Sequence, residues 1–307
     1  FFWQHPDRNL IVTSAFEHHA ILDPVEWLVE HEGAEQVLIP ITKAGVIDLD
    51  FLRKIVQTRG SEIAVISIMH SNNELGSIQP IAEIVKIAGD IPVHTDAVQS
   101  FGKVEFDFAA LNVTAATISA HKIGGPLGVA ALILKRGLDL TPVLHGGGQE
   151  REIRSGTLNA PSIVAFTAAA EYAIANMATN FKKIRELRDY FVTELKKCVT
   201  DVSINSITDP ALPGIVNATF PGTESDALLL LLDTEGISAS AGSACSAGVP
   251  RPSHVLVALG LSESDADASL RISIGTTNTK AEIDQVLAIL PSVVERARNA
   301  FVVSELN

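Results

Sequence analysis

Short apolar runs alternate with helical patterns through the first half of this chain, and this alternation constrains the fold more than any other feature. Strand–helix–strand alternation predicts an α/β fold with a mostly parallel sheet flanked by helices. Aromatic residues make up only 5 %, so the core must be built mainly from Ala, Val, Ile and Leu, which suits such a sheet. Strands are expected over residues 10–13, 36–39, 64–69, 91–96, 116–119 and 129–134.

Two of these apolar runs, and three residues that mark helix ends, refine the prediction. Residues 64–69 and 129–134 are apolar on both faces, which is typical of strands covered by helices on both sides. Pro80 marks the start of a helix and Gly89 its end. Asp48 is expected to cap the helix that follows it.

The pattern changes after residue 159, first to long helices and then to mixed strands and helices. This predicts a large domain over residues 1–178 and a smaller α+β domain over residues 179–307. The expected elements are helices over 159–178 and 180–198, strands over 215–220 and 270–274, a capping box at 223–226, and a last helix opened by residues 279–282.

Charge and cysteine usage exclude several classes of protein. Lys and Arg number 23 against 36 Asp and Glu, a net charge of −13, and no basic run stands out, so nucleic acid is not an expected partner. The acidity suits solubility or a basic protein partner. Cys198 and Cys245 are too few for a disulfide scaffold and form no CxxC metal pair. No signal peptide or membrane-length run is visible, so the expected location is cytoplasmic.

Polar segments follow three of the expected strands at the point where each strand ends. They are residues 70–73, 96–99 and 119–122. In open α/β sheets, ligands bind outside the carboxyl ends of the strands. The sequence therefore predicts a single site at that edge.

Lys122, Asp96 and Gln99 are the candidates for holding a pyridine-type cofactor there. A partly desolvated lysine can form a Schiff base, although a lone Lys is usually a solvated loop residue. A carboxylate at position 96 could keep a pyridinium nitrogen protonated, or simply cap a helix. The Gln99 amide could bond the phenolic oxygen of the same ring.

Two further polar segments have both a functional and a structural interpretation. His18, beside His19, could stack on a planar cofactor or act as an acid or base, or it could serve as a surface or capping residue. Arg154 to Thr157, after the glycines at 146–148, could bind phosphate or form a flexible interdomain loop.

The second half of the chain contributes a thiol and a cation. Cys245 lies among small residues, where a mobile exposed thiol suits nucleophilic attack, or where it could be passive. Cys198 lies in a helical pattern and is interpreted as structural. Arg271 alternates with apolar neighbours, so it could clamp a carboxylate in a cleft or face solvent.

The order and spacing of these motifs resemble those of cysteine desulfurases, in the class V aminotransferase group of fold-type I pyridoxal-phosphate enzymes. The resemblance covers nearly the whole chain. It rests on Glu17-His18, the HSNNELG run at 70–76, HTDAVQS at 94–100, SAHK at 119–122, RSGT at 154–157, GSAC at 242–245 and LRIS at 270–273. It implies the PLP-transferase fold type I and a homodimer with its sites at the subunit interface.

The resemblance also implies a role for each candidate residue. Lys122 would bind pyridoxal 5'-phosphate covalently, and Cys245 would accept sulfur. Arg271 would hold the substrate carboxylate, with Arg154 also on the substrate side. The remaining assignments are His18 stacked on the ring, Asp96 at the ring nitrogen, Gln99 at the ring oxygen, Asn73 near that oxygen and the substrate, Ser119 and His121 at the phosphate, and Thr157 at the neighbouring subunit's phosphate.

The implied activity converts L-cysteine to L-alanine, with a persulfide on Cys245 and transfer to an acceptor protein such as an iron–sulfur scaffold or a thiolation carrier. A selenocysteine or cystine lyase, or another class V aminotransferase, is the alternative enzyme. A non-catalytic subunit that binds a sulfur-transfer partner is the alternative outside enzymes. The family carries residues ahead of the position matching Phe1, including a Gly/Thr-rich turn that cups the cofactor phosphate. Nothing here matches that turn, and weaker cofactor binding is expected.

Overall fold

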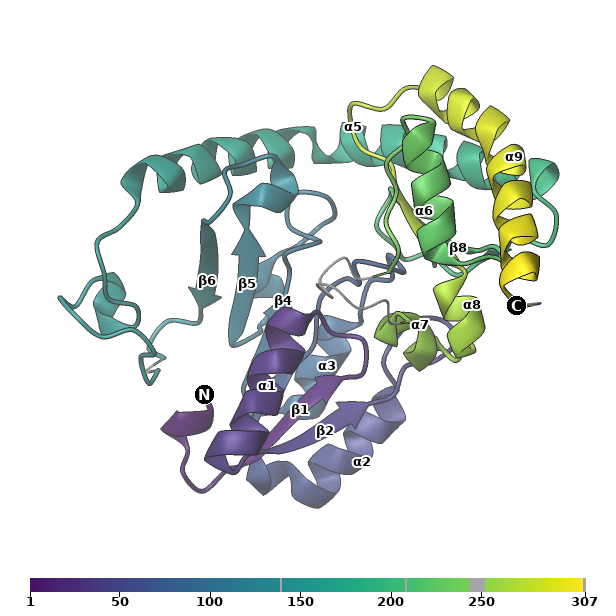
Figure 1. The fold of residues 1–307 in the computed structure, drawn as a ribbon. Coiled ribbons are helices and arrows are strands. Elements are labelled where there is room, and N and C mark those ends of the chain that lie inside the picture. The colour runs from purple at the N-terminus through teal and green to yellow at the C-terminus, as the bar shows by residue number, and fades with distance from the viewer. Residues whose placement is uncertain (139, 208, 243–251, 306–307) are drawn as a thin grey trace. The chain divides into compact units, whose positions relative to one another are not determined.

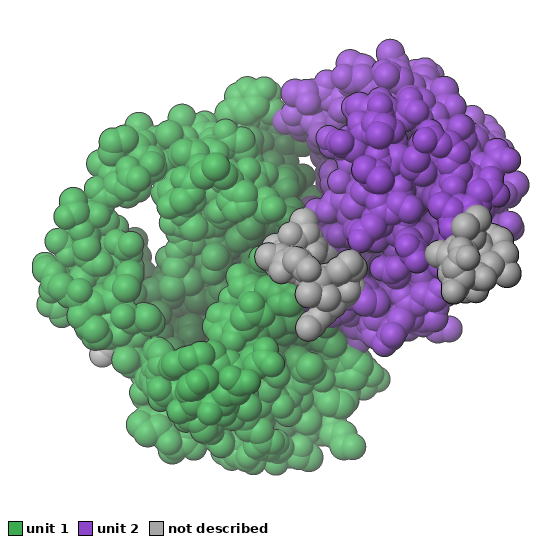
Figure 2. Space-filling view, in the orientation of Figure 1, with its two compact units in different colours: residues 1–40, 46–71, 79–177 green, residues 41–45, 72–78, 178–307 purple. Residues whose placement is uncertain are grey.

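The chain forms two compact units (Figure 2). Each unit has its own sheet. A computed structural model describes residues 1–138, 140–207, 209–242 and 252–305 (Figure 1). The first unit comprises residues 1–40, 46–71 and 79–177, and the second comprises residues 41–45, 72–78 and 178–307. The predicted sulfur acceptor, Cys245, lies outside the described residues.

The first unit is built on a six-stranded sheet with the order β2-β1-β3-β4-β5-β6. Pairing is parallel from β2 through β5, and β6 runs antiparallel to β5, so the predicted mostly parallel sheet is confirmed. The strands are β1 (Leu10–Ser14), β2 (Glu35–Ile39), β3 (Ile63–Ser67), β4 (Val93–Asp96), β5 (Ala115–Ser119) and β6 (Ala130–Leu134).

Helices lie on both sides of this sheet, with α1 in front of it in Figure 1 and α2 and α3 behind. Apolar residues of α1 pack with Ile11 and Val65 on one face. As predicted, the side chain of Asp48 caps α2 by accepting two backbone N–H groups, and Pro80 and Gly89 flank α3. The helices are α1 (His19–Glu32), α2 (Leu49–Arg59), α3 (Ile81–Ala88) and α4 (Phe108–Leu111).

The two runs that are apolar on both faces have different surroundings. Every residue of β3 is buried, as predicted for a central strand. In β6 no residue is fully buried, and Leu132 is 50 % exposed, so the prediction of helices on both faces is wrong there. The physical reason is position, because among the described strands β6 pairs with β5 alone and so forms the edge of the sheet.

A single helix, α5 (Ala160–Cys198), replaces the two helices predicted over this region. Thr179 and Asn180 suggested a break. The helix propensity of each of these residues is lower than that of Ala by about 0.5 kcal/mol, which is too little to interrupt a packed helix.

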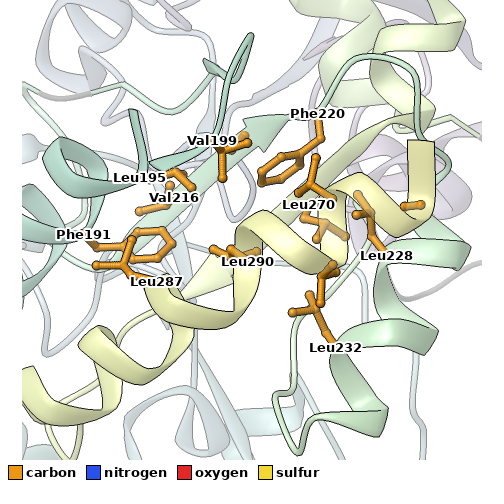
Figure 3. Close-up of a cluster of buried hydrophobic side chains, with 14 of the residues drawn as sticks. Phe191, Leu195, Val199, Val216, Phe220, Leu228, Leu232, Leu270, Leu287 and Leu290 are labelled. Atoms are coloured by element: carbon orange, nitrogen blue, oxygen red, sulfur yellow. The ribbon is translucent and has the colours of Figure 1, made fainter. Parts of the chain in front are cut away.

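The second unit has a three-stranded antiparallel sheet, ordered β7-β8-β9, with helices packed on it. Figure 3 shows the core, in which Phe191 and Leu195 of α5 meet Leu270 of β9 and Leu290 of α9. The elements are β7 (Ser203–Ile204), β8 (Ile215–Thr219), α6 (Ser225–Thr234), α7 (His254–Leu259), α8 (Glu263–Asp267), β9 (Ser269–Ser273) and α9 (Lys280–Glu305).

Helices begin at both of the predicted starts in the second unit, but only one of them has the capping box. At α9, Thr279 N donates to Glu282 Oε2 at 2.8 Å and Glu282 N donates to Thr279 Oγ1 at 3.3 Å. At α6 the predicted box is wrong, because the Thr223 hydroxyl donates instead to the carbonyl of Phe220 at 2.7 Å. None of the helices described here is long and apolar enough to cross a membrane.

Candidate active site

The carboxyl ends of four adjacent parallel strands, β1, β3, β4 and β5, meet at one edge of the first unit's sheet. Each strand leads into one of the motifs predicted to carry chemistry: His18 after β1, His70 after β3, Asp96 at the end of β4 and Lys122 after β5. The edge is where an open α/β sheet binds ligands.

Glu17 is a buried carboxyl group that connects two of the segments at this edge. Ser14 Oγ donates to its Oε1 at 2.5 Å, and the backbone N–H of Met69 lies 2.9 Å from Oε1 and 3.0 Å from Oε2. Complete burial raises the pKa of Glu17 to about 8, against the effect of these hydrogen bonds. The sequence marks Glu17 only as the neighbour of His18, and its role follows from the packing.

His18 caps helix α1 through its ring. Its Nδ1 accepts the backbone N–H of Ala20 at 3.1 Å, so the capping interpretation of this histidine is correct. The same ring lies close enough to Asp96 to favour that residue's carboxylate, so capping and cofactor contact are compatible.

Asp96 is a buried carboxyl group with cationic neighbours. Burial raises its pKa, while the N–H of Val98, 2.8 Å from Oδ1, and the nearby His18 and Lys122 oppose that shift. A pyridine-type ring nitrogen that shared a proton with this carboxylate would further favour the charged form of Asp96. The residue thus fits the predicted place beside a pyridinium nitrogen.

Lys122 lies on a one-turn 3-10 helix, Ala120–Ile123, directly after β5. Its side chain is exposed in the single chain, and its charge acts on both Asp96 and Lys103. Gly125 allows the chain to turn back here, since a Cβ at that position would lie 2.9 Å from the Cβ of Ala120. Lys103 was not among the predicted site residues.

The residues predicted at the phosphate fall into two groups within the first unit. Ser119 Oγ and His121 Nδ1 lie 2.7 Å apart, so they can face one anion together. Thr157 and Arg154 are exposed in the segment ahead of α5, where Arg154 Nη1 makes a long contact of 3.5 Å to the Ser155 carbonyl. The described contacts do not join the second group to the first.

Two histidines of the predicted motifs are structural and neutral. His94 bridges β3 and β5, with Nδ1 2.8 Å from Ser67 Oγ and Nε2 2.9 Å from Thr117 Oγ1. His70 is buried, with Nδ1 2.7 Å from Ser100 Oγ. Burial lowers the pKa of each histidine to about 4.

Arg271 and Asn73 come together in the second unit. The Arg271 guanidinium donates to the Asn73 carbonyl at 3.3 Å and to Ser240 Oγ at 3.4 Å. Among the described residues, no carboxylate lies within 4.0 Å of this guanidinium. A half-buried cation with only neutral, long contacts can accept an anionic ligand.

Cys198, the cysteine that the structure describes, has a poorly nucleophilic thiol. Cys198 ends α5 and is exposed, and desolvation raises the pKa of its thiol, which keeps it in the unreactive protonated form. Its place at the end of a helix agrees with the structural interpretation. The described ranges contain no group of three His, Cys, Asp or Glu side chains that could hold a metal ion.

Comparisons with known proteins give a consistent result. The family model described as "Aminotransferase class-V" matches residues 3–286. A curated relative, the "IscS-like cysteine desulfurase" of Mycobacterium tuberculosis, is 45% identical over 298 residues, which cover 96% of this chain and 76% of the relative. A solved structure titled "NIFS-LIKE PROTEIN" aligns with a TM-score of 0.86 and 32% identity, over 96% of this chain and 76% of that one. Another, titled "SspA in complex with cysteine", aligns with a TM-score of 0.76 and 32% identity, over 91% and 77%.

Proposed function

This chain belongs to the aminotransferase class-V family, and we infer that within it the protein acts as a cysteine desulfurase. The observation that carries the inference is structural. Lys122 and Asp96 follow adjacent strands, with His18 beside Asp96, in a chain that resembles cysteine desulfurases over nearly its whole length. No observation favours the selenocysteine or cystine lyases, or a plain aminotransferase.

Pyridoxal 5'-phosphate is the proposed cofactor, held by the first unit. Lys122 would bind it covalently, Asp96 would hold a proton on its ring nitrogen, and the ring of His18 would stack on its face. When bound, the cofactor supplies an electron sink for the negative charge that develops on the substrate. The fit rests on the donor set: a lysine, a buried carboxyl group with nearby cations, and an imidazole.

The phosphate of the cofactor is assigned to Ser119 and His121, which already face each other at 2.7 Å. Thr157 is proposed to reach the corresponding phosphate in the second protomer of a homodimer. Large apolar side chains are unusually exposed on either side of Thr157, and burial against a second copy would cover them. They are Leu127 (83 %), Val143 (71 %), Val164 (69 %) and Tyr172 (68 %).

L-cysteine is the proposed substrate. Its carboxylate would be clamped by the fork of Arg271, with Asn73 beside it and Arg154 as a further cation on the substrate side. The chemistry supports this assignment, because the Arg271 fork has only neutral partners at 3.3 and 3.4 Å. A carboxylate could replace these weak contacts with two strong ones.

Cys245 is the proposed sulfur acceptor. Its thiolate attacks the substrate sulfur, so that an S–S bond forms and the substrate Cβ–S bond breaks. The electron pair of the broken bond stays with the substrate, and protonation there leaves L-alanine. The enzyme-bound persulfide then passes its sulfur to an acceptor protein, such as an iron–sulfur scaffold or a thiolation carrier.

The test combines spectroscopy with two substitutions. Addition of pyridoxal phosphate should produce a visible absorption band, and borohydride reduction followed by peptide mapping should locate the cofactor on Lys122. Cys245→Ala should keep the band and abolish the release of alanine and sulfide from cysteine. Cys198→Ala should keep both the band and this release. Absence of the band in the wild type would reject the enzyme proposal in favour of a non-catalytic subunit.

A further inference from the structure

A second lysine, Lys103, lies within range of the charge of Lys122. Lys103 follows the β4 motif by a tight turn, in which its N–H donates to the carbonyl of Ser100 at 2.9 Å. Its side chain is partly buried, and the charge of Lys122 acts on it directly. Nothing in the proposed chemistry uses this residue.

The turn that carries Lys103 is held firmly against the helix that carries Lys122. Gly102 has φ +71°, and a Cβ there would lie 3.1 Å from Ile123 Cγ2 and 2.8 Å from the Cβ of Ala173. Only glycine allows this approach, because an added methyl group would clash and the backbone is left-handed. The packing of the first unit therefore holds the turn that carries Lys103 against the helix that carries Lys122.

Lys103 also makes one specific contact, to the side chain of Gln99. Its Nζ donates to Gln99 Oε1 at 3.1 Å. An ammonium has three donors and no acceptor, so the amide must present its oxygen to Lys103. The contact thus fixes which way the Gln99 amide faces, and the NH₂ group is left to donate elsewhere.

The charge of Lys103 has no counter-ion nearby. In the part of the chain that the structure describes, no carboxylate lies within 4.0 Å of its Nζ. Burial, followed by the charge of Lys122, lowers the pKa of Lys103 to about 8, so the ammonium stays mostly protonated at pH 7. A partly buried, unpaired cation favours an anionic group beside it.

We propose that Lys103 is a positioning residue for the cofactor ring: it turns the Gln99 amide so that its NH₂ group faces the ring oxygen. The geometry of the Lys103–Gln99 contact and the packing of Gly102 on Ile123 carry this inference. The inference rests on the proposed function, since it assumes that Lys122 holds the cofactor. Lys103 acts through Gln99 and touches neither substrate nor the reacting atoms.

The test measures the pH dependence of the bound cofactor's visible band in Lys103→Met. Without Lys103 the ring oxygen loses an oriented donor and a nearby positive charge, so the protonated form of the cofactor is favoured. The midpoint of the spectral change should rise by about one pH unit, as expected for removal of a close charge. Lys103→Arg keeps both the donor and the charge, and its midpoint should stay near that of the wild type.

A double substitution tests whether Lys103 acts through Gln99. In a Gln99→Met background, Lys103→Met should shift the midpoint by clearly less than it does alone. The matched control is Lys135→Met, since Lys135 Nζ also donates to a side-chain amide oxygen, Asn112 Oδ1 at 2.9 Å, on the exposed surface. That control should leave the midpoint unchanged.

Two outcomes overturn the inference: an unchanged midpoint in Lys103→Met, or an equal shift with and without Gln99. If Lys103→Met does not fold by circular dichroism, Lys103→Leu, which likewise lacks both the donor and the charge, takes its place with the same criteria. A wild type that shows no visible band would instead reject the proposed function. The failure of the inference and the failure of the function are therefore separate results.

Discussion

The carboxyl group of Glu17 accepts the backbone N–H of Met69 through both oxygens, at 2.9 Å to Oε1 and 3.0 Å to Oε2. One side chain thereby joins the segment after β1 to the segment after β3. His18 and His70 follow these two segments directly. The candidate site therefore rests on a buried carboxyl group that is not itself among the proposed cofactor contacts.

Glu17→Gln should flatten the pH dependence of stability. Burial raises the pKa of Glu17 to about 8 in the folded chain, against 4.5 ordinarily. Between these values the folded state holds a proton that the unfolded state lacks, so the free energy of unfolding falls as pH rises, by about 1.4 kcal/mol per pH unit. Urea unfolding at pH 5, 6.5 and 8 measures the slope, and the exposed Glu26→Gln is the control. Identical slopes in wild type and Glu17→Gln would contradict the assignment.

His94 should make the protein sensitive to acid. Burial lowers the pKa of His94 to about 4 in the folded chain, against 6.5 ordinarily. Between these values the unfolded state holds the extra proton, so stability is lost as pH falls from 6.5 towards 4. His94→Gln should cost about 1–3 kcal/mol at pH 7, through its contacts to Ser67 and Thr117. The variant should also lose less stability than the wild type between pH 6.5 and 4.5, and an equal loss would count against this role.

Asp96→Asn should separate cofactor binding from catalysis. The amide keeps the size of the side chain but cannot hold a proton on the ring nitrogen, so the cofactor should bind while alanine formation falls by about 100-fold or more. Asp107→Asn is the matched control, because Asp107 likewise accepts backbone N–H groups, those of Ala109 and Ala110, at the exposed start of α4. Single-turnover assays measure the effect, and near wild-type rates in Asp96→Asn would reject its assigned role.

Gly214→Ala should destabilise the second unit. A Cβ at Gly214 would lie 2.1 Å from the carbonyl oxygen of Ile274 and 2.7 Å from Ile184 Cγ2, and the first of these is backbone that cannot rotate away. We expect a loss of about 2–4 kcal/mol, at the upper end of overpacking costs. Gly60→Ala is the control, since Gly60 has φ −55° and no atom closer than 3.7 Å to the added carbon. Thermal unfolding compares the two, and similar melting temperatures would refute the prediction.

Local signals explain the predictions that succeeded. Asp48 caps α2 and the Thr279–Glu282 box opens α9, because a cap involves groups only a few residues apart. The same reasoning failed at Thr223, whose hydroxyl bonds the Phe220 carbonyl instead. A side chain with two local partners cannot be assigned from spacing alone.

By itself, the sequence determined the strand–helix alternation, the mostly parallel sheet, and the motif residues at strand ends, since periodicity and turn chemistry are local properties. Only the tertiary structure decided that β6 lies at an edge, that Glu17 is buried on Met69, and that Lys103 lies within range of the charge of Lys122. The reason is that burial and charge proximity depend on which distant segments pack together. That packing sets the dielectric surroundings, and with them which groups keep or lose their charge.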